Sequence, residues 1–171
     1  KMKLLSLAAF LLSLPLFSVA ADLTLEEKSK CSPKTPIEKT ATVVRTYDGD
    51  TVLVKTKSAQ YSIRMVGIDT PETHFMGHSQ GEWGDRAKEK LSELLPPNTR
   101  VRLEFGNSQC DMYGRGLAHI FVGKTHVNFE MAKEGLAANY CVYPSMAHCA
   151  EIGQQTKRAM ERRIGMFSDP Q

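Results

Sequence analysis

Two acidic residues stand at the ends of predicted strands, where they could share a metal ion. Asp50 begins a β-branched segment after Asp48-Gly49, and Asp69 ends a later apolar segment. Adjacent strands can bring both carboxylates to one end of a sheet, and carboxylates that converge repel each other unless a cation lies between them. Oxygen ligands of this kind suit Ca²⁺ or Mg²⁺ rather than a soft metal. The alternative interpretation is that Asp48-Gly49-Asp50 only forms a hairpin turn.

Two arginines and a glutamate accompany these acids. Arg64 lies in an otherwise apolar segment and needs an anionic partner, either a carboxylate in a structural role or a phosphate in a functional one. Arg115 lies between two glycines, so neighbouring side chains would not crowd an anion that approaches it. A divalent cation and two arginines can stabilise the charge of a pentacoordinate phosphate, and Glu72 could act as a base or orient water. The set predicts hydrolysis of a phosphate ester, although each arginine alone is typical of a structural salt bridge.

A small, mainly β domain must position these side chains. Short alternating or β-branched segments predict five strands, and apolar residues at helical spacing predict three helices. The expected strands cover residues 40–45, 51–55, 61–68, 101–105 and 117–122, and the expected helices cover 83–95, 127–133 and 147–164. Because the strands come first and the helices interleave late, the order favours a small β-barrel with packed helices over an alternating βαβ sheet.

The length and composition fit one ordinary globular domain. The chain has 171 residues, of which 42% are hydrophobic and 24% charged, and these values exclude a disordered chain, a coiled coil and collagen. Residues 1–21 combine a basic start, an apolar run and small residues near its end, so we expect a signal peptide and an exported, periplasmic or secreted protein that leaves the membrane after cleavage. The alternative is a retained membrane anchor, for which the run is short. We expect residues 22–39 to form an extended arm and residues 40–168 to form the domain.

The charge of the chain is too balanced to hold a polyanion by bulk attraction. The formal net charge is +3, and removal of Lys1 and Lys3 with the signal peptide lowers it by two to +1. Binding to a nucleic acid would therefore need a local cluster of positive charge. One candidate is the basic run 157–163, which is also typical of the solvated face of a terminal helix.

All four cysteines follow the predicted signal peptide. An even number of cysteines in an exported chain favours disulfides. A Cys141–Cys149 bond would close a short loop and a Cys31–Cys110 bond would pin the N-terminal arm, but four cysteines allow three pairings. A zinc site is the alternative, and it lacks a Cys-x-x-Cys pair in this sequence.

Four motifs occur together in an order and spacing that resemble the staphylococcal nuclease family. They are Asp48-Gly49-Asp50-Thr51, Arg64, Asp69-Thr70-Pro71-Glu72-Thr73 and Tyr113-Gly114-Arg115-Gly116. The resemblance extends from about Thr40 to Ser168. It implies an OB-fold, which is a five-stranded barrel with three helices, and a Ca²⁺-dependent endonuclease that cleaves DNA and RNA to 3′-phosphate products. We expect single-stranded or unpaired substrates and a monomeric protein.

The resemblance also implies a role for each matching residue. Asp50 and Asp69 correspond to direct carboxylate ligands of Ca²⁺, and Thr70 corresponds to a ligand through its backbone carbonyl. Glu72 corresponds to the proposed general base, which in an alternative role orders water at the metal. Arg64 and Arg115 correspond to the two phosphate-binding arginines. Tyr113 corresponds to the tyrosine of the nucleotide pocket, and Tyr143 corresponds to the second of two late tyrosines.

Three positions depart from the pattern of the family. Met112 stands where a lysine usually precedes the Tyr-Gly-Arg-Gly motif, and Cys141 replaces the first of two late tyrosines, with Tyr140 beside it. A usually lysine-rich loop here contains His74 and His78, which could bind phosphate when protonated or, if helical, a transition metal. None of these positions belongs to the predicted metal site or to the arginine pair, so we expect them to change substrate affinity and base preference but not the reaction.

Two other functions compete with a nuclease. A non-catalytic OB-fold module that binds oligonucleotides or oligosaccharides would share the fold. An exported structural or adhesion domain would explain the four cysteines. Neither function needs the acids and the arginines together, so the sequence favours the nuclease.

Overall fold

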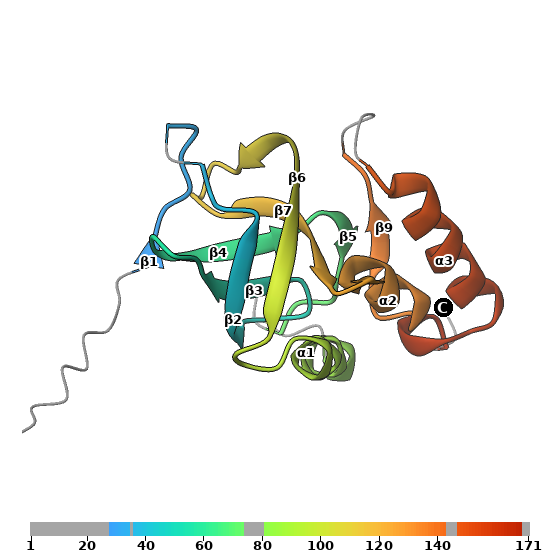
Figure 1. Ribbon diagram of the computed structural model, residues 1–171. Coiled ribbons are helices and arrows are strands. Elements are labelled where there is room, and N and C mark those ends of the chain that lie inside the picture. The colour runs from blue at the N-terminus through green and yellow to red at the C-terminus, as the bar shows by residue number, and fades with distance from the viewer. Residues whose placement is uncertain (1–27, 35, 74–80, 143–146, 169–171) are drawn as a thin grey trace, which may run out of the picture.

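The computed structural model describes residues 28–34, 36–73, 81–142 and 147–168. Five strands form a closed barrel at its centre (Figure 1). They are β2 (Thr40–Thr46), β3 (Thr51–Lys55), β4 (Gln60–Met65), β6 (Arg100–Cys110) and β7 (Gly116–Val122). The pairs β2–β3, β3–β4, β2–β6 and β6–β7 are antiparallel, and the parallel pair β4–β7 closes the barrel. The predicted five-stranded OB-fold barrel is confirmed.

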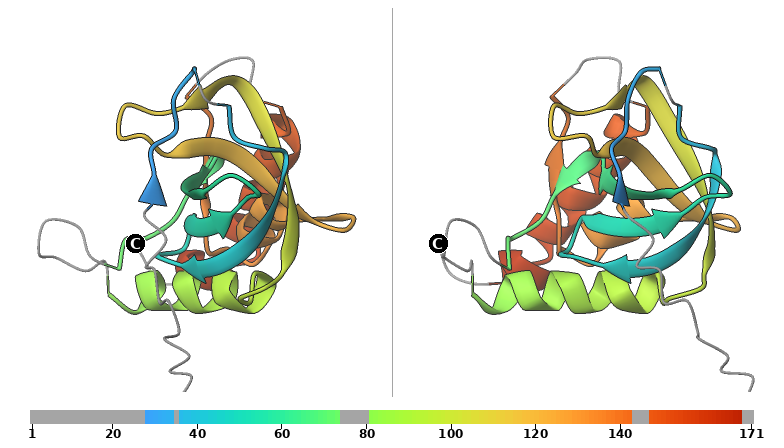
Figure 2. Two further views of the ribbon diagram at one scale, coloured as in Figure 1. Left: turned by 60° about the vertical axis from the view of Figure 1, so that its left-hand side comes forward. Right: turned by 90° about the vertical axis from the view of Figure 1, so that its left-hand side faces the viewer.

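Three helices pack on the barrel, as predicted. They are α1 (Glu82–Leu94), α2 (Val127–Lys133) and α3 (Cys149–Glu161), and a short 3-10 helix, η1 (Gly165–Phe167), follows α3. Helix α1 runs along one end of the barrel, whereas α2 and α3 lie together at its side (Figure 1, Figure 2). Helix α3 is shorter than the predicted helix over 147–164, because His148 before it and Arg163 after it adopt left-handed conformations with φ of 63° and 51°.

Four shorter strands extend the architecture. Strand β1 (Lys28–Ser29) runs parallel to β4, and β8 (Thr125–His126) forms a hairpin with β7. Strands β5 (Gly67–Asp69) and β9 (Ala138–Tyr140) form a separate antiparallel sheet, which lies between the barrel and α3 (Figure 1). Strand β9 has only three residues and was not predicted, since so short a segment carries little periodicity.

The prediction of one continuous strand over residues 61–68 is wrong. Strand β4 ends at Met65, and β5 begins at Gly67. The break occurs because Gly67 has φ of 79°, a left-handed conformation that glycine adopts without steric cost. The turn redirects the chain from the barrel to β9. It therefore places Asp69 on the small β5–β9 sheet rather than at the end of a barrel strand.

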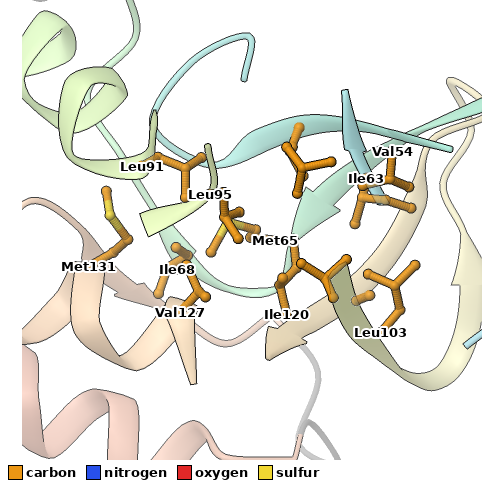
Figure 3. Close-up of a cluster of buried hydrophobic side chains, with 14 of the residues drawn as sticks. Val54, Ile63, Met65, Ile68, Leu91, Leu95, Leu103, Ile120, Val127 and Met131 are labelled. Carbon is orange, nitrogen blue, oxygen red and sulfur yellow. The ribbon is translucent and has the colours of Figure 1, made fainter. Parts of the chain in front are cut away.

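A single hydrophobic core joins the barrel to the helices (Figure 3). Its fully buried side chains include Val54, Ile63, Met65, Leu103 and Ile120 from the barrel, Ile68 from β5, Leu91 and Leu95 from α1 and its C-cap, and Val127 and Met131 from α2. Burial of each such side chain stabilises the fold by about 1.5–3 kcal/mol. The core therefore fixes α1 and α2 against the strands that carry the acidic residues.

Two disulfides link elements of the fold, one over a long and one over a short separation in the sequence. Cys31 bonds to Cys110, which joins the N-terminal segment to the end of β6, and Cys141 bonds to Cys149, which joins the residues after β9 to the first residue of α3. Both candidate pairings therefore form, and no cysteine is left for a zinc site.

The predicted signal peptide, residues 1–21, lies outside the described residues. Within the described ranges, none of the helices combines the length and the apolar character that crossing a bilayer requires.

Candidate functional site

The turn between β2 and β3 directs Asp50 into the protein. The Tyr47 amide donates a hydrogen bond to the Thr51 carbonyl at 2.8 Å, and the Asp48 carboxylate accepts one from the Asp50 amide at 3.0 Å. These bonds form the predicted hairpin turn. The Thr51 hydroxyl donates to Asp50 Oδ1 at 3.1 Å, and Asp50 is only 2% exposed. The turn therefore holds a carboxylate in an almost fully buried position.

The second predicted metal-binding segment contacts Asp50 directly. Asp50 Oδ2 accepts hydrogen bonds from the Thr70 amide at 3.2 Å and from the Thr70 hydroxyl at 3.0 Å. Thr70 follows Asp69, the last residue of β5, so the break after β4 is what carries this segment to the hairpin. The two segments that supply the predicted oxygen ligands thus meet at one place.

Arg64 joins the two carboxylates. Its Nη1 lies 2.9 Å from Asp50 Oδ2, and its Nη2 lies 2.7 Å from Asp69 Oδ1. Nη1 also donates to the carbonyls of Met65 and Ile68, at 2.8 and 3.0 Å. Arg64 reaches Asp50 because Thr51 and Arg64 are partners in the β3–β4 register. One guanidinium therefore lies between acids from the β2–β3 turn and from β5.

Burial makes the Asp50 carboxylate costly to ionise. The pKa of Asp50 is raised to about 7, because desolvation by burial and the Asp48 charge outweigh the opposing effects of Arg64 and the Thr70 hydrogen bonds. An anion in a desolvated site of this kind is stabilised by a nearby cation. The Asp69 side chain is 53% exposed, so the acidic pair, Asp50 and Asp69, is open to solvent on the side of Asp69.

The donor set fits a hard divalent ion. Asp50, Asp69 and the Thr70 carbonyl would supply oxygen ligands only, which is the chemistry that Ca²⁺ and Mg²⁺ prefer. In the described ranges, no three His, Cys, Asp or Glu side chains are arranged to hold a metal on their own. An ion here would therefore complete its shell with the carbonyl oxygen and water, as weakly held hard cations commonly do.

Helix α1 fixes the backbone of Glu72. A Cβ atom on Gly84 would lie 2.6 Å from the carbonyl oxygen of Glu72, so the first turn of α1 packs directly on this backbone. Only a glycine permits an approach this close. The helix that caps the barrel thus also sets the position of the predicted base.

The charges around Glu72 come from every part of the candidate site. Desolvation raises the pKa of Glu72, and the Asp48 and Asp69 charges raise it further, whereas Arg64 and Arg115 lower it. A carboxylate with a raised pKa is a better proton acceptor near neutral pH. Glu72 therefore lies in the electrostatic field of both predicted arginines and of the acidic pair.

Asp111 organises the turn that carries Arg115. Its carboxylate accepts hydrogen bonds from the amides of Tyr113 and Arg115, both at 2.9 Å, and from Arg115 Nε at 2.6 Å. In the described part of the chain, Nη1 and Nη2 of Arg115 make no hydrogen bond. One edge of the guanidinium is held by Asp111, and the other edge is available to an anion.

The predicted nucleotide-pocket residues are only partly described. Tyr113 is 71% exposed, and the Arg115 guanidinium lies 5.5 Å from the centre of its ring. Tyr143, His74 and His78 lie outside the described residues. Tyr140, beside Cys141, is 53% exposed on β9. Tyr113 is thus the described aromatic side chain that stands beside a predicted phosphate-binding arginine.

A shallow hollow lies beside the acidic pair. Its volume is about 280 Å³, and it is lined by Asp69, Thr70, Pro71, Trp83, Ala138 and Met166. Trp83 packs against the hydrophobic core, and the Arg86 guanidinium lies 4.7 Å from its ring centre.

Sequence reasoning did not assign roles to Asp48 and Asp111. Both residues occupy the first position of a tight turn and bond their carboxylates to backbone amides two residues later. This local pattern is an Asx turn, and an aspartate before a glycine-containing turn is its sequence signal. The pattern identifies the turns but not the functional side chains that each turn carries.

Comparisons with known proteins agree on one family. Residues 62–169 match the family model for staphylococcal nuclease homologues. Thermonuclease of Staphylococcus hyicus is 36% identical over 132 residues, which cover 77% of this chain and 78% of that protein. Thermonuclease of Staphylococcus intermedius is 33% identical, with 73% and 74% covered, and micrococcal nuclease of Shigella flexneri is 31% identical, with 75% and 73% covered.

Proposed function

The chain belongs to the staphylococcal nuclease family and is a nuclease that hydrolyses phosphodiester bonds, and on this basis we propose that it is a Ca²⁺-dependent endonuclease of DNA and RNA. Asp50, Asp69 and the Thr70 carbonyl would hold the ion. The observation that carries the proposal is the contact of one guanidinium, that of Arg64, with both Asp50 and Asp69. This contact gathers the acids and a phosphate-binding cation at one place, as in-line attack on a phosphate requires.

The ion, when bound, supplies positive charge that polarises the phosphoryl oxygens. Glu72 accepts a proton from the attacking water, or orients that water, and its raised pKa suits this role. The water oxygen bonds to phosphorus, the bond from phosphorus to the 5′-oxygen breaks, and a proton passes to the leaving oxygen. The products are a 3′-phosphate and a 5′-hydroxyl.

Arg64 and Arg115 stabilise the additional negative charge of the transition state. Arg115 binds with the edge of its guanidinium that faces away from Asp111, since Asp111 already holds Nε. Fixed donors of this kind need no reorganisation during the reaction, which is why they lower the barrier. Arg64 is anchored by the carbonyls of Met65 and Ile68, so its planar group keeps its orientation when a phosphate competes with Asp69.

We further propose unpaired nucleic acid as the preferred substrate and an exported monomer as the working form. Exposed Tyr113 stands beside Arg115 and can stack on a base that is not held in a duplex. The two disulfides suit an oxidising compartment, the periplasm or the medium.

The decisive experiment incubates the purified chain with single-stranded DNA in Ca²⁺, in Mg²⁺ and in a calcium chelator. We expect cleavage in Ca²⁺ only, with 3′-phosphate ends identified by mass spectrometry of the fragments. The Arg115→Ala variant is the matched negative control. Binding without cleavage in every ion would overturn the proposal, and cleavage in Mg²⁺ alone would overturn the choice of metal.

A further inference from the structure

Three histidines form a cluster that is separate from the acids and arginines of the candidate site. His119 lies on β7, His126 on β8, and His148 immediately before α3. The centres of the three rings are 4.8–5.0 Å apart. His119 Nδ1 and His126 Nε2 share a hydrogen bond at 3.1 Å, and His119 is only 3% exposed. The cluster therefore connects the barrel strand β7 and the adjoining strand β8 to the start of α3.

The charged groups that face the cluster come from β6. Glu104 Oε1 lies 2.7 Å from His148 Nε2, and Glu104 Oε2 lies 3.0 Å from Arg102 Nη1. Phe121 on β7 stacks on the His126 ring at 4.5 Å. Among the described residues, Glu104 and Arg102 are the carboxylate and the guanidinium whose charges shift the pKa values of these histidines. The backbone carbonyl of Ala147 accepts a hydrogen bond from His119.

The cluster contacts the strand that carries Asp69. A Cβ atom on Gly67, the first residue of β5, would lie 3.4 Å from the Cε1 atom of His119 and 2.9 Å from the Cδ1 atom of Ile152 on α3. The His119 ring and α3 thus pack on the start of β5, two residues before Asp69. In the described sheets, β5 pairs only with β9, so this packing and β9 help to position Asp69, together with the contacts of Arg64 to Ile68 and Asp69.

Strand β9 is tied in turn to His148. The Cys141–Cys149 disulfide joins the end of β9 to the residue after His148. The side-chain nitrogen Nδ2 of Asn139 on β9 donates a hydrogen bond to the Cys149 carbonyl at 3.4 Å. A continuous line of contacts therefore leads from the histidine cluster to Asp69. It passes through His148, the disulfide, β9 and β5.

The two inner histidines are neutral at physiological pH. The pKa of His119 and of His126 is lowered to about 4, mainly by burial and in addition by the neighbouring imidazoles. Glu104 opposes this effect but does not overcome it. When both rings are neutral, one nitrogen can donate and the other accept, as the bond between them requires. Two protonated rings would have only donors and would repel each other.

We propose that His119, His126 and His148 form a clamp that positions the β5–β9 sheet, and with it Asp69, and that acid opens this clamp. The inference goes beyond the proposed function, because it concerns how the fold controls the site and not the reaction itself. These histidines are positioning residues, since they act on Asp69 through β5 and β9. Opening releases β9 and the first turn of α3 from the barrel while β2, β3 and β4 keep their pairing.

The test measures amide hydrogen exchange of the full chain by NMR at pH 7.5 and pH 5.0, without calcium or nucleic acid. A histidine with a pKa of about 4 in the clamp and about 6.5 when released favours the open form about 30-fold more at pH 5.0 than at pH 7.5. After correction for the intrinsic pH dependence of exchange, we expect at least this increase for amides of β9 and of the first turn of α3. Amides of β2 and β3 are the internal reference, and their exchange should change much less.

The variant His126→Gln is the specific probe, because the glutamine amide can replace Nε2 in the bond to His119 but cannot take up a proton. In this variant, we expect acid to increase the amide exchange of β9 and of the first turn of α3 about 30-fold less than in the wild type. His74→Gln/His78→Gln is the matched control, since it replaces two histidines that are not members of the proposed clamp, and it should leave the response unchanged. Imidazole proton titration of the wild type gives a second measurement that does not depend on how the variant folds.

Four outcomes would overturn the clamp. The first is an acid-induced increase in amide exchange that is equal in β9 and in β2. The second is an increase in His126→Gln that equals that of the wild type, and the third is titration of His119 and His126 near their ordinary pKa. The fourth is protection of wild-type β9, but not of His126→Gln, by one equivalent of Zn²⁺ at pH 7.5, which would identify the cluster as a metal site. Because no substrate is present, none of these results depends on whether the proposed calcium-dependent cleavage is correct.

Discussion

Gly84 on α1 lies against the backbone of Glu72 so closely that a methyl group at this glycine would stand 2.6 Å from the Glu72 carbonyl oxygen. We therefore expect Gly84→Ala to displace Glu72 and to lower kcat. A displacement of about 1 Å at a catalytic group can reduce turnover about 10²-fold. The measurement is steady-state cleavage of a fluorogenic oligonucleotide, together with urea unfolding to separate lost activity from lost structure.

Gly153 offers a matched control on α3. A Cβ atom there meets the Asn139 side chain at 3.6 Å, which is an ordinary contact. Gly153→Ala should keep full turnover and change stability by no more than about 1 kcal/mol, because alanine favours the helix. Equal activity of the two variants would show that α1 does not position Glu72.

Arg115 and Asp111 should differ in how strongly they affect turnover. Arg115→Ala removes a charge that the transition state needs, so we expect kcat to fall about 10²–10³-fold with little change in stability. Asp111→Asn keeps an oxygen for the backbone amides but loses the charged contact to Nε, and its kcat should lie between those of the wild type and Arg115→Ala. Arg86→Ala, which removes an exposed ion pair with Glu82, is the control and should retain normal turnover. Normal turnover of a folded Arg115→Ala protein would refute the role of Arg115.

Calcium should stabilise the wild type through Asp50. For a dissociation constant near 10⁻³ M, which is usual for extracellular calcium modules, a tenfold excess of the ion stabilises the fold by about 1.4 kcal/mol. We expect differential scanning calorimetry to show a higher Tm in calcium than in chelator, and Asp50→Asn to abolish this difference. Asp85→Asn, an exposed acid on α1, should respond like the wild type. A calcium shift that persists in Asp50→Asn would place the ion elsewhere.

The histidine cluster predicts that the chain loses stability in acid. His119 and His126 have a folded pKa of about 4 and an unfolded pKa near 6.5, so the unfolded chain binds more protons between these values. The free energy of unfolding should therefore decrease as the pH falls from about 6.5 to about 4, by at most about 1.4 kcal/mol per pH unit for each histidine. Urea unfolding across this range should show a shallower decrease for His126→Gln. A parallel decrease in both proteins would assign the acid sensitivity to other groups.

The sequence was sufficient for the barrel because its signals are local. The hairpin over residues 47–51 depends on turn chemistry and β-branched neighbours, and the buried face of β4, with Tyr61, Ile63 and Met65, follows from simple alternation. The turn at Gly67 was missed because its effect depends on β9, a partner about 70 residues later in the chain that is too short to carry a pattern. Local signals of this kind predict elements well, but not the pairing of short elements across the chain.

The candidate site was predictable in its residue types but not in its contacts. The acids were identified from strand ends, Arg64 from its apolar segment and Thr70 from the family resemblance. These four residues, Asp50, Arg64, Asp69 and Thr70, do lie together. The functions of these residues stay predictions until the variants are measured. The histidine cluster had no signal in the sequence, because its members come from three separate segments and each is an ordinary residue in its own segment.

The position of Arg64 between Asp50 and Asp69 affects how the proposed site would bind a metal ion. The Arg64 guanidinium offsets one of the two negative charges of Asp50 and Asp69, so it relieves part of their repulsion without an external ion. A metal ion that binds there must then compete with the Arg64 guanidinium for the two carboxylates, so binding would need a higher concentration of the ion. At the proposed calcium site, the side chain that would bind the phosphate would therefore also raise the calcium concentration needed to fill the site.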